Sequence, residues 1–186
     1  ERGRDKIYLY GDIRLGGRAY VDAFFKALHA SGMRGAHVVF ELFRLADAAY
    51  IQKWTDWAGR TGNTLEATHS PESGHASLRR QFGKHYSNER LLEHCRLMAD
   101  SGIPQSVYFM LGIPGQTRRE VLDTLELADA IAGIYSRRFR KEHLRHDVVS
   151  YNFMQVPDAG SRMFRQPGRH VVRLELRTFT HLVDRL

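Results

Sequence analysis

The sequence predicts an α/β protein in which helices flank a parallel sheet. Five short runs rich in β-branched and aromatic residues alternate with segments that have apolar residues at helical spacing. These runs begin about 28 to 42 residues apart, which leaves room for at least one helix between successive strands. Such βαβ alternation is typical of a parallel sheet with helices outside it. The predicted strands are residues 6–10, 36–43, 64–69, 105–111 and 147–154.

Helical spacing and end signals predict the segments between the strands. The four predicted helices span 19–30, 46–58, 87–100 and a segment that opens at Thr117. Thr117 and Glu120 form a capping-box pattern, and glycine follows the first and third helices at positions 32 and 102. On the first helix the predicted apolar face is Tyr20, Ala23, Phe24, Ala27 and Leu28. A further helical pattern covers residues 175–186.

Length and composition indicate one soluble domain spanning residues 1–186. Hydrophobic residues make up 42% and charged residues 26% of the chain, which is ordinary for a folded protein. No apolar run approaches the roughly 20 residues that a membrane helix needs, so no membrane partner is expected. Cys95 is the single cysteine, which excludes a disulfide scaffold, and no apolar region of a signal peptide follows Glu1. We therefore expect a cytoplasmic protein.

The chain is basic, with 28 Lys and Arg against 21 Asp and Glu, a formal charge of +7. Part of this excess lies in the basic run 137–146, which is typical of a solvated helix end or loop. Phe139 is the one aromatic residue within that run, so stacking on bases is not indicated and nucleic acid is not the expected partner. The positive electrostatic field of these residues would also attract an anionic ligand. A non-catalytic basic module that binds an anionic partner such as RNA remains an alternative.

Polar residues and glycines follow the predicted strands, where ligands bind in parallel α/β folds. The segments are 10–14, 40–43, 66–75, 112–117 and 151–155. Glu41 lies inside an apolar run, so its carboxylate needs a cation, a metal or a hydrogen-bond donor. A structural salt bridge with an arginine is the plain alternative for Glu41. Glu72 and Ser73 could instead cap the next helix, and the glycine-rich segment 112–115 could be a tight turn.

The order and spacing of four segments point to one family. Pro-Glu-Ser-Gly at 71–74, Leu-Arg-Arg-Gln-Phe-Gly-Lys at 78–84, Tyr-Ser-Asn-Glu at 86–89 and the segment 108–117 together resemble the second half of a radical S-adenosylmethionine domain. The resemblance runs from the Asp12 strand to residues 158–164. Glu41-Leu42-Phe43 and the Ser-Pro-Glu-Ser turn at 70–73 resemble the cobalamin-dependent methyltransferase subgroup, which includes the tryptophan methyltransferases of thiopeptide biosynthesis.

This resemblance implies a partial (βα)6 TIM-like barrel, of which the chain would supply the second to sixth strands. It also implies a four-iron four-sulfur cluster, S-adenosylmethionine, and cobalamin held by a domain outside these residues. The family's cluster needs three cysteines, and Cys95 lies in a predicted helix, where a buried packing role is expected. We therefore expect the first strand and the cluster loop upstream of Glu1; a degenerate member is the alternative.

The resemblance also assigns ligand-binding positions. By motif, Asp12, Glu72 and Ser73 would approach the methionine and ribose portions of S-adenosylmethionine, while Gly112, Ile113 and Pro114 would line the adenine site. Glu41 would either hydrogen-bond S-adenosylmethionine or bind the open iron of the cluster. In the second case radical formation would be suppressed. The protein would then transfer the methyl group through cobalamin by polar, two-electron chemistry.

Three further residues are candidates for contact with a substrate. Tyr108 and Asn152 lie on predicted strands, and Tyr108 is a candidate general base. His69 is a candidate hydrogen-bond donor to a substrate; its spacing to His75 matches no compact zinc motif.

The resemblance favours cobalamin-dependent methylation of an unactivated or aromatic carbon in natural-product biosynthesis. The expected substrate is a small molecule or a peptide precursor, and an electron donor is a possible partner. Radical chemistry without cobalamin (hydrogen abstraction, epimerisation or methylthiolation) is the alternative within the family.

Overall fold

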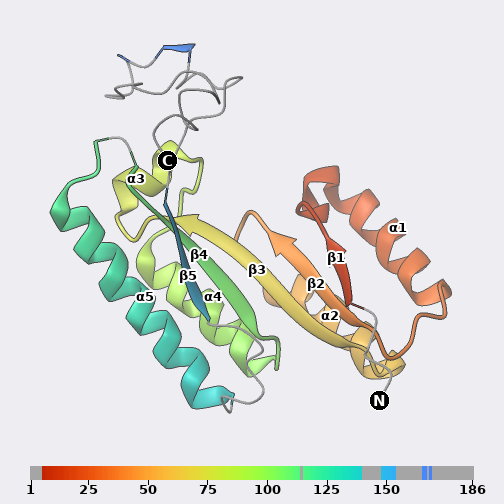
Figure 1. Cartoon of the computed structure of the whole chain (residues 1–186). Coiled ribbons are helices and arrows are strands. Elements are labelled where there is room, and N and C mark those ends of the chain that lie inside the picture. The colour runs from red at the N-terminus through yellow and green to blue at the C-terminus, as the bar shows by residue number, and fades with distance from the viewer. Residues whose placement is uncertain (1–5, 114, 140–147, 154–164, 167, 169–186) are drawn as a thin grey trace, which may run out of the picture.

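Five parallel strands form one sheet, and they lie side by side in the order in which they occur along the chain. The computed structural model describes residues 6–113, 115–139, 148–153, 165, 166 and 168. The strands are β1 (Lys6–Leu9), β2 (His37–Leu42), β3 (Thr64–Glu72), β4 (Gln105–Leu111) and β5 (Val149–Phe153). All their carboxyl ends therefore lie at one edge of the sheet, called here the carboxyl edge (Figure 1).

Helices connect successive strands and lie along the outside of the curved sheet (Figure 1). They are η1 (Ile13–Gly16), α1 (Gly17–Ala30), α2 (Ala48–Thr61), α3 (Ala76–Gln81), α4 (Asn88–Asp100) and α5 (Arg118–Arg138). Sequential parallel strands with outer helices are the arrangement of a partial TIM-like barrel. The predicted fold class is confirmed. Among the described residues no helix is both long and apolar enough to cross a membrane.

Polar side chains fix where three of the helices begin. The side chains of Asp47, Ser87 and Thr117 accept hydrogen bonds from the first-turn amides of α2, α4 and α5. At α5 the predicted capping box is complete, because Glu120 also accepts the Thr117 amide at 2.7 Å. Each cap satisfies amides that the helix itself leaves unpaired, so these helix starts are determined locally by the sequence.

The core lies between the sheet and the helices. The ring of Phe40 on β2 stacks on that of Trp54 on α2, with 4.4 Å between centroids and 9° between planes. Strand alternation therefore turns Phe40 and Leu42 toward the helices, and it turns Val39 and Glu41 toward the opposite, concave face. Cys95 is fully buried in α4, as expected for a packing residue.

The predicted face of the first helix is wrong in part. Val21 and Phe25 are its buried residues, whereas Tyr20 is 54% exposed and Ala23 and Ala27 are also exposed. Phe24 and Leu28 of the predicted face are partly buried and pack against the core, so the buried face is rotated from the predicted one. Two short helices, η1 and α3, were not predicted, and β3 continues three residues beyond its predicted end. The helical pattern at 175–186 and the ends of the predicted strand 147–154 lie outside the described residues.

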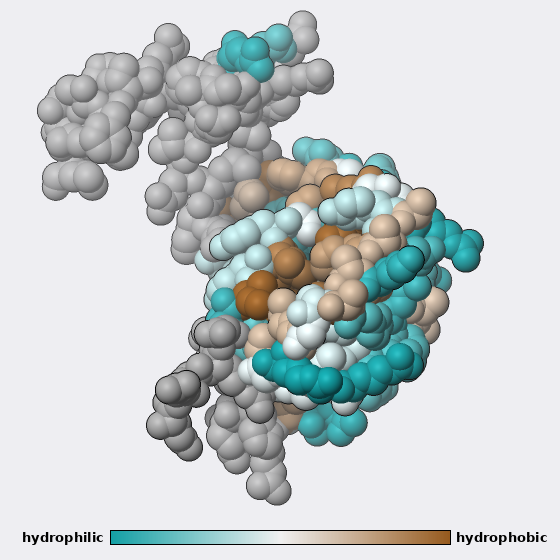
Figure 2. All heavy atoms as spheres, turned by 90° about the vertical axis from the view of Figure 1, so that its right-hand side faces the viewer, coloured by the Kyte–Doolittle hydropathy of each residue, from teal (hydrophilic) through white to brown (hydrophobic). Residues whose placement is uncertain are grey.

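One end of the sheet is formed by β1, which pairs only with β2 among the described residues. The large apolar side chains Tyr8, Tyr10, Leu15 and Tyr20 are exposed on β1, η1 and α1 and in the segment between them. Figure 2 shows this side of the molecule, where apolar residues lie together with hydrophilic residues along the border. Within the described part of the chain, the outer edge of β1 thus has no partner strand and lies beside exposed apolar surface.

Candidate functional site

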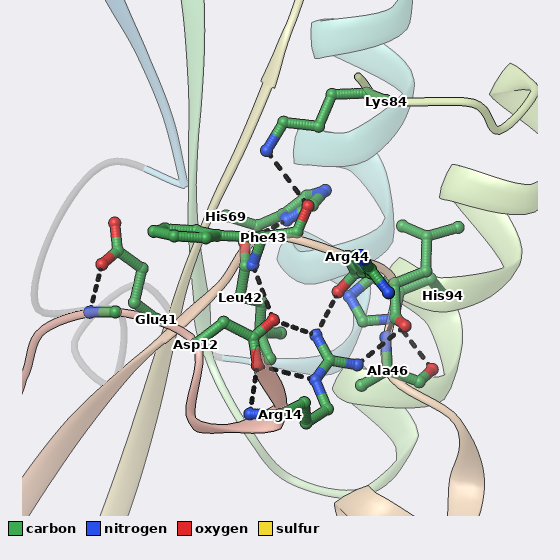
Figure 3. Close-up of polar contacts among 12 residues, drawn as sticks. Asp12, Arg14, Glu41, Leu42, Phe43, Arg44, Ala46, His69, Lys84 and His94 are labelled. Carbon is green, nitrogen blue, oxygen red and sulfur yellow. Dashed lines mark hydrogen bonds and ion pairs between the residues drawn. The ribbon is translucent and has the colours of Figure 1, made fainter. Parts of the chain in front are cut away.

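Two hydrogen bonds join the first two strand ends at the carboxyl edge. The Gly11 amide donates to Glu41 Oε2 at 2.7 Å, and the Phe43 amide donates to Asp12 Oδ2 at 2.9 Å. Gly11 has a φ of 83°, a backbone conformation that favours glycine. The loop after β1 is therefore held against the end of β2, and Figure 3 shows both contacts.

Asp12 is buried, and its carboxylate is fully engaged within the protein. Besides the Phe43 amide, it accepts the Arg14 amide and two guanidinium nitrogens of Arg14, at 2.8 and 2.5 Å. Burial alone would raise the pKa of Asp12, but the hydrogen bonds and charge of Arg14 outweigh burial and lower it below 3.8. Arg14 also donates to the carbonyls of Arg44 and Leu45 (Figure 3). The oxygens of Asp12 thus hold two loops together, and its contact with S-adenosylmethionine stays a prediction.

The carboxylate of Glu41 accepts a hydrogen bond, as expected for a carboxylate inside an apolar run. The donor is a backbone amide rather than an arginine. The Glu41 side chain is half-buried and points away from the Asp12–Arg14 pair (Figure 3). Among the described residues, Oε2 accepts the Gly11 amide, and Oε1 has no hydrogen-bond partner. One carboxylate oxygen of Glu41 can therefore accept a group from outside the described chain.

Glu72 ends β3 with a strained backbone and an unsatisfied carboxylate. Its φ of 71° is the one positive value at a non-glycine residue in the described chain. The side chain is half-buried, and no described residue donates a hydrogen bond to it. Burial raises the pKa of Glu72 above its ordinary value of 4.5, and the positive charge of Lys84 offsets part of that rise. Strain together with an unsatisfied carboxylate is typical of functional sites.

Lys84 brings a positive charge to the same edge. Its Nζ donates to the Phe43 carbonyl at 3.0 Å and lies 5.5 Å from the centre of the Phe43 ring. Figure 3 shows the lysine reaching from the segment after α3 to the end of β2. The sequence analysis included Lys84 in a motif but gave it no role. The glycine before it, Gly83 with φ 74°, marks the turn that aims this side chain.

The turn after Glu72 packs tightly against α5. Ser73 is fully buried, and its Oγ accepts the His75 amide at 3.0 Å and lies 3.4 Å from Thr124 Oγ1. The hydroxyl of Ser73 is turned into the protein, and its approach to S-adenosylmethionine stays a prediction. His75, not Glu72 or Ser73, occupies the N-cap position of α3. A Cβ at Gly74 would lie 2.5 Å from the Asp123 carbonyl oxygen and from Thr124 Cα, so only glycine fits this approach.

A glycine turn follows β4. Gly112 has a φ of 77°, and its amide donates to Gln116 Oε1 at 2.9 Å. Ile113 is buried, and its carbonyl accepts the Gln116 amide at 2.8 Å. The segment is therefore a tight turn, and Gly112 is exposed there, so a flat ligand could approach its backbone. Pro114 lies outside the described residues.

His69 lies on the helix side of the sheet. It is 1% exposed; its Nδ1 contacts the Leu42 carbonyl at 2.7 Å and its Nε2 contacts the Tyr86 hydroxyl at 2.9 Å. The burial of the ring and the charge of His94 lower the pKa of His69 to about 3, so the imidazole is neutral near pH 7. Both ring nitrogens have protein partners, and the contact of His69 with a substrate stays a prediction.

Tyr108 and Asn152 lie on neighbouring strands near the carboxyl edge. In the register of β4 and β5, Tyr108 pairs with Ser150 and Met110 pairs with Asn152. Tyr108 is half-buried, and the alternation along β4 places it opposite the core residues Val107 and Phe109, on the concave face. The side chain of Asn152 lies outside the described structure.

An ionisable network covers the concave face below the carboxyl edge. The buried carboxylate of Glu66 accepts the Ser106 hydroxyl at 3.1 Å, contacts His37 Nε2 at 3.0 Å and lies 3.9 Å from Lys6 Nζ. It therefore connects side chains from β1, β2 and β4 to β3. The concave face carries polar groups where the helix side is mainly apolar.

The described residues do not form a metal centre. They contain no group of three or more His, Cys, Asp or Glu side chains that could hold a metal ion. Burial raises the pKa of the Cys95 thiol to about 12, and its Sγ contacts Gln105 Oε1 at 3.7 Å. An iron–sulfur cluster is held by several cysteine thiolates, and the chain has one cysteine. These residues therefore do not fit such a cluster by themselves.

Comparison with known proteins gives one family. The family model of the radical SAM superfamily matches residues 2–128, from before β1 into α5. No curated protein matches the chain.

Proposed function

The chain belongs to the radical SAM superfamily, and from this membership we propose that its carboxyl edge binds S-adenosylmethionine through Glu72 and Lys84. Membership implies an enzyme that uses S-adenosylmethionine and a four-iron four-sulfur cluster. When bound, S-adenosylmethionine supplies an activated carbon–sulfur bond, which is the source of a methyl group or of a carbon radical.

The unsatisfied carboxylate of Glu72 carries this proposal. S-adenosylmethionine has an ammonium group and ribose hydroxyls, and each can donate a charge-assisted hydrogen bond to a carboxylate. Glu72 is half-buried and receives no hydrogen bond from the described protein, so a ligand would supply the missing donor. Its strained φ of 71° gives the side chain a direction that the backbone of a regular strand would not give it.

Lys84 complements the other charge of the ligand. The methionine portion carries a carboxylate, and the ammonium of Lys84 is held at the same edge by the Phe43 carbonyl. The positive charge of Lys84 lowers the pKa of the Glu72 carboxyl against the rise caused by burial, and no ion pair joins the two side chains among the described residues. A zwitterionic ligand between them would pair both charges. Gly112, exposed at the next strand end, would allow the adenine ring to approach the backbone.

The cluster needs ligands from outside these residues. Cys95 is buried in the core, and its thiol stays protonated near neutral pH. Among the described residues no strand pairs with the outer edge of β1, which supports the expectation that a further strand, preceding a loop with the cluster cysteines, lies beside it. Glu41, which has one oxygen without a hydrogen bond from the described chain, stays a candidate for contact with S-adenosylmethionine or with iron.

Methyl transfer through cobalamin is the finer proposal. Only the motif resemblance of residues 41–43, 70–73 and 158–164 supports it. Corrinoid retained by the anaerobically isolated protein would support methyl transfer. A corrinoid-free protein that still consumes S-adenosylmethionine would favour hydrogen abstraction, epimerisation or methylthiolation.

The proposal is tested by S-adenosylmethionine binding to the full-length protein, isolated anaerobically with its native cofactors. In equilibrium dialysis, Glu72→Gln removes the charge with little change in shape, and we expect roughly tenfold or greater loss of affinity. The matched control is Glu93→Gln, because Glu93 is 63% exposed on α4 and forms only a surface pair with Arg90. Equal affinity in both variants would contradict the role of Glu72.

A further inference from the structure

A basic cavity lies far from the carboxyl edge, between the C-terminal turns of α4 and α5. It has a volume of about 310 Å³, and its lining is Arg96, Ala99, Asp100, Ile134, Arg137 and Arg138. α4 and α5 run side by side toward the edge of the sheet opposite the strand ends (Figure 1). Since α5 has 21 residues at about 1.5 Å per residue, the cavity lies roughly 30 Å from the turn after β4.

Three guanidinium groups at this cavity form no ion pair with an acidic side chain in the described part of the chain. Arg96, Arg137 and Arg138 are exposed, and no ion pair among the described residues includes any of them. Asp100 lies one helical turn after Arg96, and the two side chains are not paired. The arginines also offset the negative ends of the helix dipoles. That effect needs only charge near the last turn, whereas three guanidinium groups around one hollow also provide paired donors for an anion.

We propose that this cavity binds an acidic peptide segment through carboxylate side chains. Ala99 and Ile134, which are 1% and 6% exposed, form an apolar floor that fits the side chain next to an acidic residue. The lining has no aromatic residue on which a base could stack, and stacking on aromatic side chains is a main source of affinity for single-stranded nucleic acid. These features favour a peptide with alternating acidic and apolar residues over a nucleic acid.

This assignment gives a role to the start of the basic run that the sequence analysis noted at 137–146. Arg137 and Arg138 are the first two residues of that run, and Arg96 joins them from a helix about forty positions earlier. The site is independent of S-adenosylmethionine, so it stands or falls separately from the proposed function. A peptide held here would be anchored far from the carboxyl edge.

Fluorescence anisotropy of the full-length protein with a fluorescein-labelled peptide of alternating Glu and Leu residues tests the proposal. We expect saturable binding, and roughly tenfold or greater loss of affinity in Arg96→Gln/Arg137→Gln. The matched control is Arg18→Gln/Arg90→Gln, which removes two charges from side chains that are 97% and 74% exposed on other surfaces. We expect the control to bind within twofold of the parent.

Three results would overturn the proposal. The parent could bind a Gln–Leu peptide as tightly as the Glu–Leu peptide, which would exclude carboxylate recognition. The two double variants could lose affinity equally, which would indicate general charge attraction. Labelled oligouridine could bind the cavity more tightly than the peptide, which would identify nucleic acid as the ligand.

Discussion

The Phe43 amide donates to Asp12 Oδ2 at 2.9 Å, so the residue after β2 is joined to the loop after β1. Asp12→Ala removes this bond and leaves the guanidinium of Arg14 without its carboxylate. Because Asp12 is buried, we expect a loss of about 2–4 kcal/mol in the free energy of unfolding, measured with urea. Asp22→Ala is the control; Asp22 is half-exposed and forms surface pairs with Lys53 and Arg18. A loss as small as the control's, below about 1 kcal/mol, would contradict the positioning role.

The approach of Gly74 to α5 gives a second prediction. In Gly74→Ala the new Cβ would collide with backbone atoms of Asp123 and Thr124, which cannot move without shifting the helix. We expect a loss of about 2 kcal/mol or more in unfolding free energy and weaker binding of S-adenosylmethionine, because Glu72 lies two residues away. Gly59→Ala is the control, since a Cβ there meets nothing within 4 Å, and alanine favours the helix. Equal stability of the two variants would show that the turn is not packed as described.

Two buried histidines predict a fall in stability on acidification. Burial, together with the neighbouring His94, lowers the pKa of His69 to about 3, and burial lowers the pKa of His94 to about 4. Between these pKa values and the ordinary pKa of 6.5, the two histidines bind protons in the unfolded chain but not in the folded protein. The free energy of unfolding therefore falls as the pH falls from 6.5 toward 4. The slope is about 1.4 kcal/mol per pH unit for each histidine. Urea unfolding between pH 7 and pH 5 measures this slope.

The variant His94→Gln separates this effect from that of the carboxyl groups. Glu72 has a raised pKa and contributes a pH dependence of opposite sign, and it is present in both proteins. We expect the variant to show about half the histidine-dependent slope of the parent. An identical slope in both would show that His94 does not titrate on unfolding in this range.

Tyr108 is a candidate base on the concave face, which gives a prediction about turnover. In Tyr108→Phe the ring stays in place and the hydroxyl is lost, so affinity for S-adenosylmethionine should stay within twofold. Turnover should fall by roughly a hundredfold or more if the hydroxyl transfers a proton. Product formation and equilibrium dialysis on the same preparation separate the two effects. Losses of similar size in turnover and in affinity for S-adenosylmethionine would contradict the role of Tyr108 as a base.

Much of the fold could be predicted from local patterns. Residues 105–111 form a strand with the predicted bounds, and the capping box of Thr117 and Glu120 opens α5 as expected. Such signals depend on nearby residues and are visible in the sequence. The buried face of α1 could be predicted only in part, because Phe24 and Phe25 both pack on Trp54, far along the chain, and the position of α1 on the sheet decides that Val21 and Phe25 are the buried residues.

The edge at which the candidate residues lie could be predicted from the sequence. The polar segments after the strands do meet at one edge, because parallel strands place their carboxyl ends together. The side of the sheet that His69 faces could not be predicted, since it depends on packing against the helices. Lys84 received no role because its approach to Phe43 spans 41 positions of sequence.

The structure of the full-length protein with S-adenosylmethionine bound tests the central claim most directly. We expect the ammonium or a ribose hydroxyl of the ligand within about 3.2 Å of the Glu72 carboxylate, and the ligand carboxylate beside Lys84. A ligand bound away from the end of β3, with Glu72 hydrogen-bonded only to protein groups, would contradict the claim.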